Sequence, residues 1–154
     1  MSQALYSILI PLREDALILP NSAVSEVTVQ ETLEPPDEGS PPWMMGWYAL
    51  AERRVPVIAF EALNGAKPPA LGRRTRLTII NSFGTRIHGS QFALLTPGHP
   101  QMISLTPEVV RAAALRPTDR AELLLSRLRV GDRQAAIPDL EAIEGALAAS
   151  LPVV

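Results

Sequence analysis

The chain has 154 residues, a length typical of one domain or of two small lobes that share a core. Hydrophobic residues make up 47% and charged residues 19%, a composition typical of globular rather than disordered proteins. The absence of cysteine excludes disulfides, cysteine–zinc sites and a cysteine nucleophile. A formal net charge of −2 argues against a general nucleic-acid binder. The apolar run of residues 5–12 is too short to span a bilayer, so we expect a soluble, cytoplasmic protein.

The N-terminal third predicts a β-hairpin followed by a strand. Two apolar runs, residues 5–12 and 16–20, flank a polar turn at Arg13–Asp15. Asn21 and Ser22 can then cap a single helical turn that extends to Val24. Residues 26–31 alternate strictly between valine and polar residues, which indicates a strand with one wet face. The acidic, proline-rich residues 33–42 form a surface connection.

The middle of the chain predicts a second hairpin and a short helical turn. Residues 43–51 and 54–58 are its strands, and Pro56 belongs at a sheet edge or strand end because it lacks a backbone donor. The helical turn of residues 60–64 ends at Gly65. The connection after it is the candidate border between two lobes, so we expect the chain to cross between them near residues 65–75.

The C-terminal half predicts further strands and a closing helix. Strands are expected over residues 75–82, 87–95 and 101–105, and a third hairpin joins residues 123–130 to 134–137. The Thr106-Pro107-Glu108 sequence is typical of a helix start, and Asp139 is expected to cap a helix from Leu140 to about Ala148.

About ten short strands without strand–helix alternation favour small antiparallel barrels or a sandwich. The side chains expected to be buried on the apolar strand faces are Val27, Val29, Val55, Val57, Ile79, Phe92 and Ile137.

The sequence contains no pattern that amounts to an active site. His88 and His99 are the only histidines, and no third metal ligand lies near them, so no metal is expected. Ser90 follows His88 closely but lacks a nucleophile-elbow motif. Arg86 lies across a predicted turn from Arg73, Arg74 and Arg76, which are either a solvated strand face or an anion site.

The large aromatic side chains gather after the proline-rich connection. Trp43, Trp47 and Tyr48 precede a polar turn that carries Glu52, Arg53 and Arg54. Such rings are typical of a core at a lobe junction, and they are also enriched in interface hot spots. Both interpretations remain open. If the second holds, these six residues form a partner-binding surface.

The segment from Trp43 to Gly65 resembles the CheW-like chemotaxis adaptor family. Gly46 and Pro56 keep the family's spacing, and Leu50, Val55, Val57 and Ile58 keep its apolar positions. The opening hairpin and residues 135–141 resemble the family's start and end, so the similarity covers roughly residues 5–147. The nearest branch is the divergent, ChpC-like one that accompanies type IV pilus chemosensory systems.

This resemblance implies an all-β fold of two packed, SH3-like, five-stranded barrels with a short C-terminal helix. The whole chain, residues 1–154, would then be one domain with two barrel subdomains. It also implies a non-enzymatic adaptor, without cofactor, that links methyl-accepting chemoreceptor tips to the regulatory domain of a chemotaxis histidine kinase. Twitching motility is the implied output. Neither nucleic acid nor direct membrane insertion is implied.

The sequence departs from the family pattern where an Asn, an Arg and a Gly are expected, since Ala49, Ala51 and Glu52 stand there. Arg53 or Arg54 can replace the missing arginine. An alternative function is a small hydrolase or ligand-binding barrel that uses Arg86, His88 and Ser90, which requires these groups to converge in one pocket.

Overall fold

The computed structural model describes residues 5–29, 33–50, 52–67, 72–82, 84, 87 and 90–150. Its strands are β1 Leu5–Pro11, β2 Ala16–Pro20, β3 Val24–Val29, β4 Met44–Leu50, β5 Arg53–Ile58, β6 Arg76–Asn81, β7 Gln91–Thr96, β8 Gln101–Leu105, β9 Val110–Ala113, β10 Leu124–Val130 and β11 Arg133–Pro138. Its helices are α1 Phe60–Leu63 and α2 Leu140–Ser150, with 3-10 turns η1 Asn21–Ala23 and η3 Ala121–Leu123.

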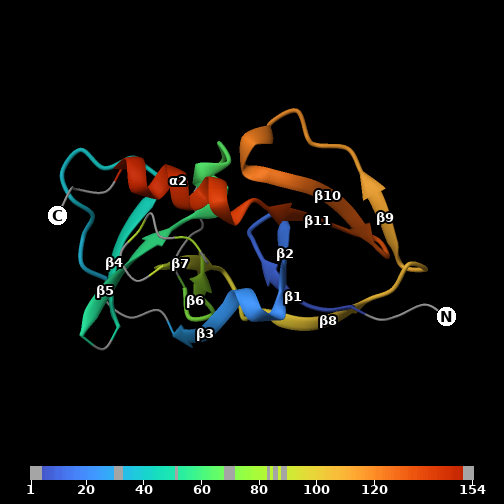
Figure 1. The fold of residues 1–154 in the computed structure, drawn as a ribbon, viewed down its shortest axis with the longest axis horizontal. Coiled ribbons are helices and arrows are strands. Elements are labelled where there is room, and N and C mark those ends of the chain that lie inside the picture. Colours follow the sequence, from blue (N-terminus) through green and yellow to red (C-terminus); the bar gives the residue numbers. More distant parts are fainter. Residues whose placement is uncertain are drawn as a thin grey trace.

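The strands form two curled sheets that pack against each other (Figure 1). One has the order β8-β1-β2-β11-β10-β9, and the other has the order β3-β6-β7-β5-β4. The all-β, two-barrel prediction is confirmed, although one sheet has six strands in place of the expected five. Nearly all pairings are antiparallel, the described exceptions being β2 with β11 and β5 with β7.

The predicted crossing near residues 65–75 is wrong. The strands on either side of that connection, β5 and β6, belong to the same five-stranded sheet. The chain instead leaves the six-stranded sheet through η1, after β2, and returns to it between β7 and β8. A proline-rich connection indicates a break in regular structure, but it carries no information about which sheet the next strand joins.

The three predicted hairpins are confirmed. β1 pairs with β2, β4 with β5 and β10 with β11, all antiparallel. Pro56 lies opposite Trp47 inside β5, which is an interior strand and not an edge. The pairs of β5 with β7 are Val57 with Ala93 and Ile58 with Leu94, so the proline lies just before that ladder. Its missing N–H is tolerated at this position.

The core has three parts because the central strands are buried on both faces. The five-stranded sheet encloses one cluster of six fully buried side chains, including Val57 and Ile79. The six-stranded sheet encloses a second cluster around Leu9 and Ile18. The largest cluster lies between the sheets and takes side chains from both, together with Ile143 and Leu147 of α2.

The expected core residues are only partly confirmed. Val55, Val57, Ile79 and Phe92 are buried, but Ile137 and Val27 are only partly buried and Val29 is 52% exposed. β3 is an edge strand of its sheet, and its register shifts between Val24 and Glu26. The alternation identified the strand correctly over residues 26–29, while residues 30 and 31 lie outside the described part of the chain, and at a sheet edge the apolar face of the strand is incompletely covered.

The helix expected at Thr106-Pro107-Glu108 is also absent. These residues form a turn in which the Val109 N–H donates to the Thr106 carbonyl at 3.1 Å, and β9 follows directly. β-branched residues at 109 and 110 favour extended backbone, and pairing with β10 completes the strand. The predicted turn through Val24 is the short η1, without a side-chain cap.

The closing helix is confirmed. The Ala142 N–H donates to Asp139 Oδ1 at 3.2 Å, as expected of an N-cap, and Ile143 and Leu147 are buried. Glu144 on the same helix is buried and accepts a hydrogen bond of 2.6 Å from the Ser82 hydroxyl. No helix in the described part of the chain is long and apolar enough to cross a membrane.

Replacing Ile79 by alanine is expected to lower the free energy of unfolding by about 2–5 kcal/mol, because a fully buried side chain leaves a cavity. Val29→Ala on exposed β3 is the control, with a change within about 0.5 kcal/mol. Urea denaturation of both variants measures the difference. Equal effects of the two substitutions would contradict the assigned core.

Candidate functional site

The aromatic residues predicted as binding anchors contribute mainly to the core. Trp47 is 7% exposed and belongs to the cluster between the sheets, against which Trp43 also packs. Tyr48 points to the other side of β4 and packs against the interior of the five-stranded sheet. The two sides follow from strand alternation. All three rings therefore have a packing role, and Trp43 and Tyr48 are partly exposed.

Next to the polar turn of the β4–β5 hairpin, the side chain of Arg54 stacks on the ring of Trp47. The Arg54 guanidinium carbon lies 4.1 Å from the centroid of the Trp47 ring. Its Nη1 also lies 3.2 Å from Glu34 Oε2, in an ion pair whose side chains are 49% and 59% exposed. Arg53 is only partly exposed and donates a hydrogen bond to Gln91 Oε1, while Glu52 is exposed at the turn. We call Trp47, Glu34 and Arg54, together with the turn residues Glu52 and Arg53, the hairpin surface.

Backbone pairing holds Glu34 at this place. Glu34 and Trp47 exchange two backbone hydrogen bonds of 2.9 Å, which adds one residue to the outer edge of β4. Gly46 permits this approach, because its φ is +141° and a Cβ there would lie 2.3 Å from the Glu34 carbonyl oxygen. Arg54 is thus held between the Trp47 ring and the Glu34 carboxylate, which come from separate segments of the chain.

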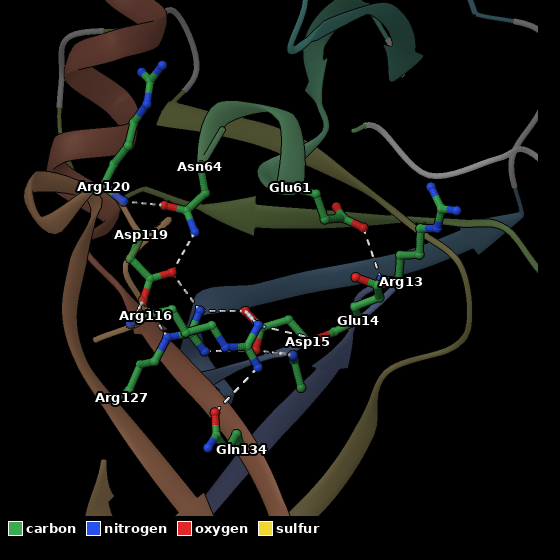
Figure 2. Close-up of polar contacts among 11 residues, drawn as sticks. Arg13, Glu14, Asp15, Glu61, Asn64, Arg116, Asp119, Arg120, Arg127 and Gln134 are labelled. Atoms are coloured by element: carbon green, nitrogen blue, oxygen red, sulfur yellow. Dashed lines mark hydrogen bonds and ion pairs between the residues drawn. The ribbon is translucent and has the colours of Figure 1, made fainter. Parts of the chain in front are cut away.

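A second polar site lies where the two sheets meet, around the buried Arg127 of β10 (Figure 2). Arg127 donates to both oxygens of Asp15 at 3.0 and 2.7 Å, and to both oxygens of Asp119 at 2.6 and 2.8 Å. The side chain of Arg127 is fully buried, and that of Asp119 is 1% exposed. One planar guanidinium therefore neutralises two carboxylates through bidentate pairs.

Further contacts extend this network to α1 and to the surface. Asn64, after α1, donates to Asp119 Oδ1 at 3.0 Å and accepts from the Arg120 backbone N–H at 2.8 Å. The Arg116 guanidinium lies 3.5 Å from Asp15. Hydrogen bonds from Arg127 hold the pKa of Asp119 well below its usual range, although burial opposes this effect. Asp119 thus remains charged when the pair is formed.

Glu61 of α1 lies beside this network in a different environment. Its residue exposure is 7%, and its Oε2 accepts a hydrogen bond of 3.1 Å from the Arg13 backbone N–H. Within the part of the chain that the structure describes, its buried Oε1 has no hydrogen-bond partner. Burial raises the pKa of this carboxyl, and the Arg13 hydrogen bond offsets the rise in part.

These groups line an open cavity of about 300 Å³ between α1, the β1–β2 turn and the segment before η3. We call it the junction cavity. Its charged lining contains Asp15, Asp119, Glu61 and Arg127, which are mostly or fully buried, and the partly exposed Arg116. Its apolar lining is Leu12, Phe60 and Ala66, and its rim carries Arg13, Glu14 and Lys67.

Sequence reasoning did not identify the junction cavity. The sequence places Asp15 in a polar turn, where a carboxylate is usually exposed to solvent, but its side-chain exposure is only 10%. The pairs of Arg127 with Asp15 and Asp119 span 112 and 8 residues. No sequence signal indicates the buried arginine, because Arg127 and Arg129 alternate with Leu128 and Val130, a pattern that predicts a solvated strand face.

The residues of the alternative, hydrolytic function are only partly described. Arg86 and His88 lie outside the described residues. Ser90 has a φ of +52°, and its hydroxyl donates to the Gly84 carbonyl oxygen. His99 contacts the Pro100 carbonyl at 2.7 Å. Arg73 and Arg74 are exposed in a turn, and Arg76 donates to the Arg73 and Thr75 carbonyls.

Removing the buried guanidinium tests the network. Arg127→Met leaves Asp15 and Asp119 buried without their counter-ion, which is expected to cost about 3–5 kcal/mol in the free energy of unfolding. Arg129→Met, an exposed arginine two residues further along the same strand, is the matched control and should cost less than about 0.5 kcal/mol. Chemical denaturation at pH 7 gives both values. A loss below 1 kcal/mol for Arg127→Met would contradict the network.

The pKa of Glu61 predicts a pH-dependent stability. Because folding raises this pKa above the unfolded value of 4.5, ionisation at neutral pH destabilises the folded state. Glu61→Gln should therefore unfold at a higher temperature than the natural protein at pH 7. The difference should shrink as the pH falls through the folded pKa and then below 4.5, where the carboxyl becomes protonated in both states. A difference that is constant with pH would show that charge is not its cause.

Comparison with known proteins agrees with this architecture. The structure resembles the crystal structure of the scaffolding protein TtCheW from Thermoanaerobacter tengcongensis, with a TM-score of 0.72 and 16% sequence identity. The match covers 88% of this chain and 84% of that one, and at this identity it bears on the fold alone. No curated protein matches the sequence. Residues 7–146, most of the chain, match the CheW-like domain. The chain therefore belongs to the CheW-like domain family.

Proposed function

We propose that this protein is a non-enzymatic adaptor of a bacterial chemosensory system, acting in the cytoplasm without a cofactor. It would bind the regulatory domain of a chemotaxis histidine kinase and the tip of a methyl-accepting chemoreceptor. Membership of the CheW-like family supports this role. The observation that carries the assignment of a binding surface is Arg54, stacked on Trp47 and half exposed beside the hairpin turn.

The geometry of Arg54 suits recognition of an acidic partner. A guanidinium held between a ring and a carboxylate loses less side-chain entropy on binding than a freely moving one. Arginine and tryptophan are also the residues that contribute most to interface hot spots. The expected partner surface is a helix that presents a carboxylate to Arg54 and an apolar side chain to the partly exposed rings.

The finer assignment is to systems that control type IV pili, and it rests on the sequence resemblance. Deletion of the gene should impair twitching motility and leave flagellar swimming intact. Impaired swimming with normal twitching would instead place the protein in a flagellar chemosensory system.

Arg54→Ala is expected to weaken binding to the kinase regulatory domain or to the receptor tip by about 1–3 kcal/mol, as calorimetry would measure. The melting temperature should change little, because the side chain is exposed. Arg53→Ala tests the rest of the predicted surface, although its contact with Gln91 makes a loss of stability part of its effect.

Arg129→Ala, an exposed arginine on the other sheet, is the control and should bind like the natural protein. Unchanged affinity in both Arg53→Ala and Arg54→Ala would refute the hairpin surface. The turn that carries Arg73 and Arg74, with Arg76, would then be the next surface to test.

A further inference from the structure

The lining of the junction cavity carries four carboxylates and four basic side chains, but its three least exposed carboxylates do not share these counter-ions equally. Asp15, Asp119 and Glu61 face Arg127 and Arg116. Hydrogen bonds and ion pairs join the first two carboxylates to the two arginines. Apart from its own backbone N–H, Glu61 has one backbone donor, the Arg13 N–H on Oε2, and among the described residues no hydrogen-bond partner on Oε1. A buried carboxylate oxygen without a donor is costly, so this position favours a hydrogen-bond donor with positive charge.

The surroundings of Glu61 define the shape of such a donor. Leu12, Phe60 and Ala66 give the cavity an apolar lining along which a short alkyl chain can lie. Its volume of about 300 Å³ is at the lower end of small-molecule sites. A chain of a few methylene groups with a charged end matches both features, as lysine side chains do when their stems are buried.

The hydrogen bonding of Glu61 also distinguishes between the two common organic cations, guanidinium and primary ammonium. A guanidinium is best satisfied by two acceptor oxygens in its plane, so both oxygens of Glu61 would have to turn toward it, whereas Oε2 is directed at the Arg13 N–H. A primary ammonium is a compact charge that needs only one strong acceptor at a time. The single unpartnered oxygen therefore favours the ammonium.

We propose that the junction cavity binds a primary alkylammonium group, with Glu61 as its counter-ion and the apolar lining around its alkyl chain. The group belongs either to a free small amine or to a lysine side chain of a partner protein. Lys67, the only lysine in the chain, lies at the rim and competes electrostatically with the incoming cation. The proposal is independent of the adaptor function, which is tested at the hairpin surface.

The test is a titration of the ¹⁵N-labelled full chain, followed by amide chemical shifts. n-Butylammonium should shift the amides of residues 12–15 and 60–67 with a dissociation constant on the order of 1–10 mM. Methylguanidinium should bind at least about threefold more weakly. Glu61→Gln should weaken n-butylammonium binding at least about 10-fold, because the counter-ion is lost.

Glu14→Gln is the matched control, since it removes the same charge from the rim and should change the affinity less than about threefold. Lys67→Met should bind as tightly as the natural protein or more tightly. Two further probes separate the sources of the ammonium: putrescine represents a free amine, and a blocked Gly-Lys-Gly peptide represents a partner lysine. Binding of either supports the site, and binding of the peptide assigns it to a protein partner.

Three results would overturn the proposal. One is the absence of saturable shifts up to 50 mM n-butylammonium, roughly five times the weakest expected constant. Another is equal binding by Glu61→Gln, and the third is tighter binding of methylguanidinium. Melting temperatures of every variant show whether the fold is retained, so a failure to fold is distinguished from a failure to bind.

Discussion

The architecture depends on one buried guanidinium. Arg127 bridges Asp15, in the turn between β1 and β2, and Asp119, in the segment before η3. Burying these three charges is costly, and the cost is recovered only if both bidentate pairs form with good geometry. The network therefore acts as a geometric constraint: a displaced turn or segment would leave a charge buried without its partner. Asn64 transmits this constraint to α1, which follows a strand of the other sheet.

Strand β5 connects the two candidate sites. Arg54 lies near its first residue, and α1, with Glu61, begins two residues after its last. A strand of six residues spans roughly 20 Å, so the hairpin surface and the junction cavity lie at opposite ends of one buried element. Val55, Val57 and Ile58 along it are fully buried, which fixes the strand between two cores. The position of one site is thus mechanically tied to that of the other.

Local patterns predicted the elements well because their causes are local. Apolar runs around short polar turns identified all three hairpins, and Asp139 identified the start of α2. The failures have non-local causes. Pairing of β9 with β10 overrode a helix-start motif at Thr106, and the edge position of β3 exposed Val29. The junction cavity was missed because it assembles turns that are far apart in sequence, whereas the hairpin surface lies within one continuous segment and its contact with Glu34.

The central claim is that the Arg127 network couples the two sheets through the contact of Asn64 with Asp119. A double-mutant cycle of Asn64→Ala and Asp119→Ala measures this coupling directly in the free energy of unfolding. The 3.0 Å hydrogen bond to a buried, charged carboxylate predicts a coupling energy of about 1–3 kcal/mol. Additivity of the two substitutions within about 0.3 kcal/mol would show that the sheets are not coupled through this network.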